Sequence, residues 1–131
     1  MMVIFPEGDP LKRSQNALQA ALEIREHCLR ASRETDPALF PIQVNIGICS
    51  GEVYIGPTKI RGIRGDRWTF TASGTVTVMA ARLSDYARGG QILVGEETAR
   101  VVEGIFSLTR LEKVQLKNFK NPVDVYQITG L

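Results

Sequence analysis

The sequence predicts an α+β fold in which one β-sheet carries helices packed on it. Residues 10–33 repeat apolar side chains at helical spacing, for example Leu11, Leu18 and Leu22. Residues 42–48 (IQVNIGI) alternate apolar and polar side chains, which is typical of a strand buried on one face. Helix and strand patterns then alternate to residue 128 without an internal repeat, which favours one mixed α and β domain.

The N-terminal elements follow from this pattern. We expect residues 3–5 to form a strand that ends at a turn rich in proline and glycine. The first helix then begins with Asp9 as its N-cap and Pro10 at its first position, because both residue types are favoured there. Residues 35–41 carry two prolines and are expected to form a loop before the strand at 42–48.

The second half of the chain is predicted as shorter elements. Residues 52–55 and 67–72 are expected to be strands. The segment 56–66 between them, rich in basic residues and glycine, is expected to be a mobile hairpin loop. Gly74 opens a helix that ends at Gly89–Gly90. The remaining predicted elements are a strand at 91–94, a helix at 96–102, and strands at 106–111 and 123–128.

Composition restricts the class of protein. The 131 residues suit one domain spanning residues 1–131, and 44% apolar with 23% charged residues is typical of a folded chain. A net charge of +2 gives no support for nucleic acid or an anionic membrane as a partner, and no apolar run is long enough to span a bilayer. Cys28 and Cys49 lack CxxC spacing, so we interpret them as free thiols in a reducing cytoplasm.

Three segments resemble class III nucleotidyl cyclase catalytic domains. Residues 68–91 (WTFTASGTVTVMAARLSDYARGGQ) resemble the signature of a strand, a turn glycine and a helix that ends in Ala-Ala-Arg-Leu. Residues 44–53 (VNIGICSGEV) are similar to the family's strand pair, and residues 114–126 (VQLKNFKNPVDVY) to its closing hairpin. The chain thus resembles the C-terminal two-thirds of that domain, which implies a ferredoxin-like, cyclase-type sheet.

The resemblance implies a reaction and roles for three residues. In the family, the 3′-hydroxyl of ATP or GTP attacks its own α-phosphate, with two Mg²⁺ or Mn²⁺ ions, at a site shared by two subunits. By position, Arg82 takes the role of the arginine that stabilises transition-state charge. Thr71 matches the residue that reads the purine edge, and Lys117 matches a lysine that approaches phosphate. The implied partners are therefore a purine nucleoside triphosphate and a second cyclase-type subunit, as a homodimer or heterodimer.

The sequence departs from the family pattern at two places. Val78 stands where the family has an asparagine that orients the ribose, four residues before Arg82. The N-terminal strand and the segment with the two metal-binding aspartates have no counterpart, and Asp9 follows the strand at 3–5 where those aspartates would precede it. We therefore expect no metal site in this chain alone and no activity by this chain alone.

The absent strand would be central to the family's sheet, so residues upstream or another chain would have to cover the exposed edge. A second interpretation is a non-catalytic dimerisation or nucleotide-binding regulatory module with the same fold. Val78 favours that module, whereas Thr71 and Arg82 favour a cyclase domain. An RNA-binding domain of similar topology is rejected, because aromatic residues are only 7% of the chain and no strand carries the required aromatic run.

Overall fold

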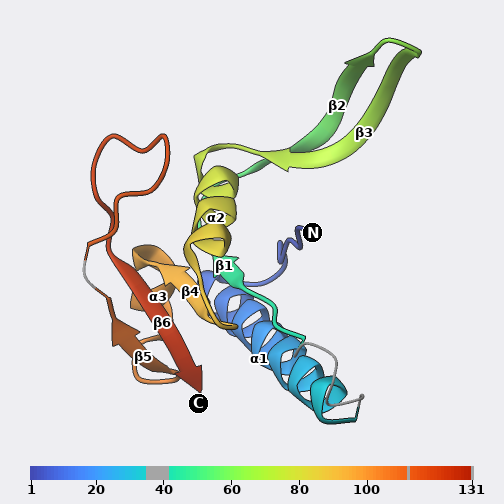
Figure 1. Cartoon of the computed structure of the whole chain (residues 1–131). Helices are drawn as coiled ribbons and strands as arrows, with labels where there is room; N and C mark the ends of the chain where they lie inside the picture. Colours follow the sequence, from blue (N-terminus) through green and yellow to red (C-terminus); the bar gives the residue numbers. More distant parts are fainter. Residues whose placement is uncertain (35–41, 112, 131) are drawn as a thin grey trace.

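The computed structural model describes residues 1–34, 42–111 and 113–130, apart from the side chains of residues 58, 60 and 69–71. The chain contains both helices and strands, in the order α1-β1-β2-β3-α2-β4-α3-β5-β6, in agreement with the predicted mixed fold (Figure 1). The helices are α1 (Pro10–Glu34), α2 (Thr75–Tyr86) and α3 (Glu96–Val102). The strands are β1 (Ile46–Ile48), β2 (Tyr54–Gly62), β3 (Gly65–Ser73), β4 (Ile92–Gly95), β5 (Ser107–Arg110) and β6 (Val125–Gly130).

Four strands form a mixed sheet in the order β1-β4-β6-β5. β1 runs parallel to β4, with Ile46 opposite Ile92, whereas β6 is antiparallel to both β4 and β5. The parallel pair is connected through α2, because parallel neighbours need a long crossover. β1 forms one edge of this sheet, and its outer side pairs with no described strand.

β4 separates two hydrophobic cores. Its side chains alternate between the two faces of the sheet, so Ile92 and Val94 pack with α1 and α3, while Leu93 packs with α2. All three are fully buried, as expected of a central strand covered on both faces. The second core also contains Leu116 of the segment before β6, so this segment is held on the α2 side.

Gly47 lets α2 lie directly on the sheet. A Cβ atom at this position would be 2.2 Å from the carbonyl oxygen of Ala80 and 2.5 Å from the backbone nitrogen of Ser84. Those distances are far below van der Waals contact, so only glycine permits this approach. The orientation of α2 on the sheet therefore depends on one residue of β1.

The segment expected to be a mobile loop is a β-ribbon, so that prediction was wrong. β2 and β3 pair without interruption from Tyr54–Ser73 to Gly62–Gly65, leaving a two-residue turn at the tip. The glycines flank this turn, and Gly65 has a φ of +124°, which other residues rarely adopt. Lys59 Nζ lies 3.2 Å from Asp66 Oδ2 across the strands. Figure 1 shows that the ribbon projects away from the rest of the molecule.

Two further strand predictions were wrong. Residues 3–5 form no strand; Val3 and Ile4 are exposed and have no described strand beside them to accept their backbone hydrogen bonds. The strand expected at 42–48 is limited to β1, because only Ile46–Ile48 lie opposite β4. The loop expected at 35–41 lies outside the described residues.

Other local predictions were confirmed. Asp9 caps α1, with its Oδ1 accepting a hydrogen bond of 2.8 Å from the backbone N–H of Lys12. The helix expected at 96–102 coincides with α3, and both cysteines are free. No helix in the described part of the chain has the length and apolar character needed to cross a membrane.

We predict that Gly47→Ala destabilises the fold by about 1–3 kcal/mol, the usual penalty for overpacking a core. Gly56→Ala is the matched control, because a Cβ there would meet no atom within 4 Å. Urea denaturation followed by circular dichroism measures the free energy of unfolding of both variants. Equal midpoints for the two variants would show that α2 does not depend on this contact.

Candidate functional site

Arg82 lies on α2 with its guanidinium only weakly paired. The side chain is 29% exposed, and its Nη1 lies 3.8 Å from Oδ2 of Asp85, which is itself 71% exposed. An ion pair of this length at the surface contributes little stability. The Nε–H of Arg82 is buried and has no hydrogen-bond partner among the described residues. Because the side chain is partly exposed and its ion pair is long, the terminal Nη groups of Arg82 are available to bind an external anion.

Val78 lies one helical turn before Arg82 on the same side of α2. Its side chain is 46% exposed, which is unusual for valine on a helix packed against a sheet. The backbone N–H donates to the Gly74 carbonyl at 3.2 Å, so it is not free for a ligand. A ligand held by Arg82 would therefore meet an apolar surface at this position.

Thr71 lies in β3, opposite Gly56 of β2, close to the point where the ribbon joins α2. Its side chain is outside the described set, so the structure locates only its backbone. Tyr54, which sequence reasoning did not select, stands at the same junction. Its Cδ2 atom is 4.0 Å from the position of a Cβ on Gly74, and the residue is 75% exposed. The only signal in the sequence was an aromatic residue at the start of a strand.

Lys117 is exposed in a turn between the buried residue Leu116 and Phe119. The turn is closed by the N–H of Phe119, which donates to the carbonyl of Leu116 at 3.1 Å. Leu116 and Leu83 of α2 belong to the same hydrophobic cluster. The structure thus brings the elements that carry Lys117 and Arg82 to the same side of the sheet, although the sequence separates them by more than thirty residues.

Arg82 is partly exposed, and Val78 and Lys117 are exposed, at the surface of the single chain. Two cavities, of about 200 and 470 Å³, are formed by other parts of the described chain, and Arg82, Val78 and Lys117 line neither of them. The α2 side is therefore an open surface that presents a cation and apolar groups.

The described residues do not fit a site for the two metal ions that the family resemblance implies. Within the described ranges, no group of three or more His, Cys, Asp or Glu side chains is placed to hold a metal ion. The carboxylate of Asp85 is paired with Arg82.

Comparison with protein families gives one match, to a family described as the adenylate and guanylate cyclase catalytic domain, over residues 5–130. A comparison with curated proteins finds no significant match.

Solved structures of cyclases share the fold. The adenylyl cyclase CyaB from P. aeruginosa is 22% identical with a TM-score of 0.79, over 94% of this chain and 62% of its own. The guanylate cyclase domain of RhGC from Catenaria anguillulae, solved with GTP, is 24% identical with a TM-score of 0.73, over 95% of this chain and 63% of its own. The guanylyl cyclase Cya2 is 23% identical with a TM-score of 0.74, over 96% of this chain and 62% of its own.

The chain therefore spans less than two thirds of the length of these structures. At 22–24% identity, the likeness to these structures establishes the fold alone. Since the family match extends over residues 5–130, this chain belongs to the adenylate and guanylate cyclase catalytic domain family and corresponds to part of such a domain.

Proposed function

We propose that this chain supplies the arginine-bearing half of a nucleotidyl cyclase active site, which is completed by a second subunit. The observation that carries the proposal is Arg82, held on a rigidly packed helix with a buried Nε–H that lacks a partner. In the reaction, the 3′-oxygen bonds to the α-phosphorus and loses its proton. The bond from that phosphorus to the bridging oxygen breaks, and pyrophosphate leaves with the electron pair.

Arg82 would act on the α-phosphate oxygens, where negative charge increases in the transition state. Its guanidinium donors can form charge-assisted hydrogen bonds there, and the pair with Asp85 is long enough to exchange at little cost. Thr71 would contact the purine edge, and Lys117 would approach the phosphates from its turn. These two roles are carried over from the family motifs at those positions.

Val78 limits how well this half-site can work. Valine offers no hydrogen bond to the ribose, and a missing positioned donor costs about 3–4 kcal/mol at a transition state. This residue is the one that favours the alternative function, a non-catalytic dimerisation or nucleotide-binding regulatory module of cyclase fold. The two functions differ in whether Arg82 contributes to turnover in an assembled pair.

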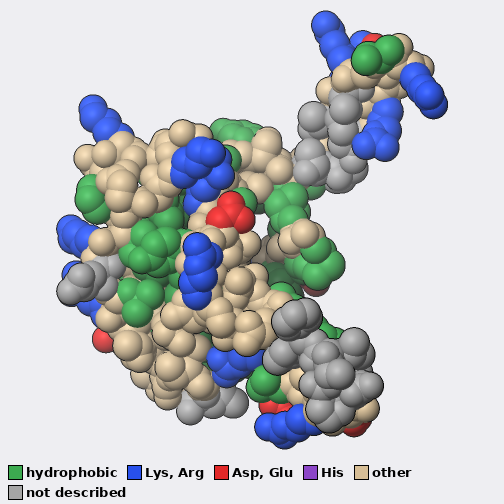
Figure 2. Space-filling model, viewed as in Figure 1, with side chains coloured by type: hydrophobic (Ala, Val, Ile, Leu, Met, Phe, Trp, Pro, Cys, Tyr) green, Lys and Arg blue, Asp and Glu red, His purple; other side chains and the backbone are tan. Residues whose placement is uncertain are grey.

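The second subunit would be another copy of this chain or a related cyclase subunit in a cytoplasmic signalling protein. Support comes from the β2–β3 ribbon, because an isolated two-stranded ribbon is at best marginally stable in water. Ile55 and Trp68 project on one face of it and are 47% and 66% exposed. Figure 2 shows apolar and basic side chains along this projecting ribbon. A partner that covered the ribbon would remove this apolar surface from water.

We predict that the purified chain alone forms no cyclic AMP or cyclic GMP from ATP or GTP with Mg²⁺ or Mn²⁺. The reason is that its described residues provide no carboxylate cluster for the metals. Product formation is measured by chromatography with a full-length cyclase as the positive control. Turnover above background that Arg82→Ala abolishes would contradict this prediction.

We predict that the chain self-associates at micromolar concentrations, and that Trp68→Ser weakens this association by removing apolar contact area. Multi-angle light scattering over a concentration series gives the oligomeric state. Ile105→Ser is the control, because Ile105 is also exposed, at 40%, but lies outside the ribbon. A monomer at every concentration, or equal effects of both variants, would argue against the ribbon as an interface.

We predict that this chain partly rescues a cyclase subunit that keeps its metal carboxylates but has lost its own arginine. Val78→Asn should increase the rescued rate by up to a few hundredfold, the kinetic equivalent of about 3 kcal/mol. Arg82→Ala should abolish rescue, whereas Arg100→Ala, an exposed arginine on α3 paired with Glu96 and Glu97, should leave it unchanged.

The measurement is cyclic nucleotide formation by mixed subunits under identical conditions. If Arg82→Ala rescues as well as the unmodified chain, Arg82 has no catalytic role, and the regulatory module becomes the better description.

A further inference from the structure

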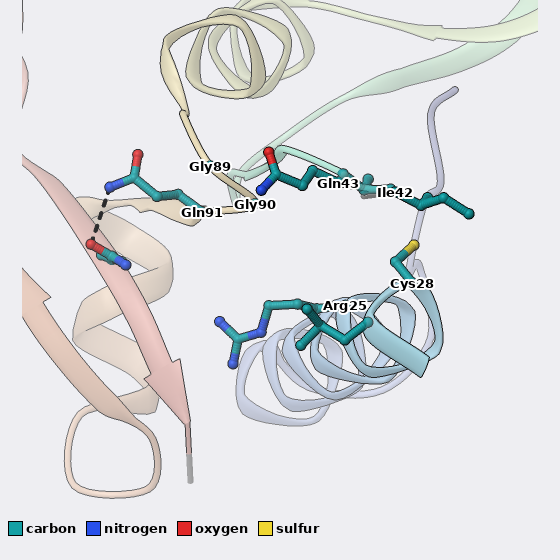
Figure 3. A pocket seen from close by; sticks show the side chains of 10 residues that line it. Arg25, Cys28, Ile42, Gln43, Gly89, Gly90 and Gln91 are labelled. Carbon is teal, nitrogen blue, oxygen red and sulfur yellow. Dashed lines mark hydrogen bonds between the residues drawn. The ribbon is translucent and has the colours of Figure 1, made fainter. Parts of the chain in front are cut away.

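A second candidate site lies away from α2, in a cavity of about 200 Å³. Its walls come from the C-terminal half of α1, the segment that leads into β1, residues 89–91 between α2 and β4, and Gln127 of β6 (Figure 3). Neither Arg82 nor Lys117 takes part, so the cavity is separate from the half-site proposed above.

The polar side of this cavity presents hydrogen-bond donors. Gln91 is held in place at both ends of its amide. Its Oε1 accepts from the Arg88 N–H at 2.9 Å, and its Nε2 donates to Gln127 Oε1 at 3.2 Å. The Oε1 atom of Gln127 accepts this hydrogen bond, whereas the Nε2 group of Gln127 has no acceptor among the described residues. Gln127 therefore offers N–H groups at the cavity wall.

Arg25 adds a positive charge to the same cavity. The side chain is half-buried, and no carboxylate of the described chain pairs with it, in contrast to Arg30 on the same helix, which lies 3.9 Å from Glu26. Figure 3 shows its guanidinium directed toward the side of the cavity where Gln91 and β6 lie. A half-buried guanidinium beside an amide donor is complementary to an anion, since neither group can accept a hydrogen bond.

The opposite wall is apolar. It is formed by Cys28, Leu29, Ile42 and Val44. In Figure 3, Cys28 and Ile42 lie at the end of the cavity away from Gln91. A ligand that satisfies both walls has an anionic head and a short hydrocarbon body. A fully hydrated inorganic anion would leave the apolar wall unused.

We propose that this cavity binds a small organic carboxylate, with the carboxylate on Arg25 and Gln127 and the hydrocarbon chain against Leu29 and Ile42. The volume accommodates a molecule of a few carbon atoms. This site goes beyond the proposed cyclase function and does not depend on it. The turn that follows α2 forms part of its wall, so an occupant would contact the chain close to the helix that carries Arg82.

Cys28 provides a built-in reporter of occupancy. The chain has two cysteines, and burial raises the pKa of the Cys49 thiol to about 12, so Cys49 stays protonated and unreactive at neutral pH. Labelling by a maleimide at pH 7 therefore follows Cys28 at the cavity wall. We expect acetate, propionate, butyrate and pentanoate to slow this labelling. Their potency should rise by up to about fourfold for each added methylene that becomes buried. Inorganic phosphate should protect less well than pentanoate.

Variants test the assigned contacts. Arg25→Gln should weaken protection by pentanoate about tenfold to a hundredfold, as expected for the loss of a charge-assisted hydrogen bond. Arg25→Lys should restore part of it. Arg30 is an exposed arginine on the same helix, so pentanoate should protect Cys28 in Arg30→Gln as strongly as in the unmodified chain.

Three outcomes would each overturn the proposal. One is unchanged Cys28 labelling at every carboxylate chain length in the unmodified chain, a test that requires no variant to fold. Another is equal protection by pentanoate in Arg25→Gln and in the unmodified chain. Protection by phosphate as strong as that by pentanoate would also overturn it, because the apolar wall would then have no role.

Discussion

The contact between α2 and the sheet at Gly47 determines the geometry of the proposed half-site. The backbone of α2 approaches β1 so closely that the position of a Cβ on Gly47 lies 2.2 Å from the Ala80 carbonyl oxygen. Leu83, the residue after Arg82, is fully buried beneath the helix. Because Leu83 is fixed in the core, Arg82 is directed to the edge of the helix, where its Nε is buried but part of its guanidinium stays accessible. A looser packing would let the arginine relax toward water and lose this arrangement.

β4 keeps the two candidate sites apart. Successive side chains of β4 lie on opposite faces of the sheet. Leu93 therefore lies on the α2 side, Ile92 and Val94 lie on the α1 side, and each face has its own core. The arginine half-site belongs to the first side. The cavity proposed to bind a carboxylate is lined by α1, the segment before β1 and Gln127 of β6, and residues 89–91 after α2 also contribute to it.

The electrostatic state of Arg82 supports the proposal of an active site shared between subunits. An arginine with a saturated ion pair would have to break it before binding phosphate, at a cost that increases with burial. Here the nearest carboxylate, Asp85, is distant and solvated. Val78, by contrast, is unfavourable for catalysis, because its exposed apolar side chain can neither orient a ribose nor stabilise charge. One site thus combines a residue suited to transition-state stabilisation with one that weakens it, which is the physical basis of the two functional alternatives.

The sequence by itself determined the local elements and the family. The N-cap at Asp9, the helix α3 and the strand β4 follow from interactions within a few residues, and these predictions were confirmed. The motif that ends in Arg82 was also recognisable from residue types alone. Tertiary structure decided what depends on distant partners. Residues 3–5 have no strand beside them among the described residues, and residues 56–66 belong to a ribbon whose strands pair from Tyr54–Ser73 to Gly62–Gly65. The buried position of the Arg82 Nε, and the common cavity lined by Arg25 and Gln127, about one hundred residues apart in sequence, exist only after the sheet and helices have packed.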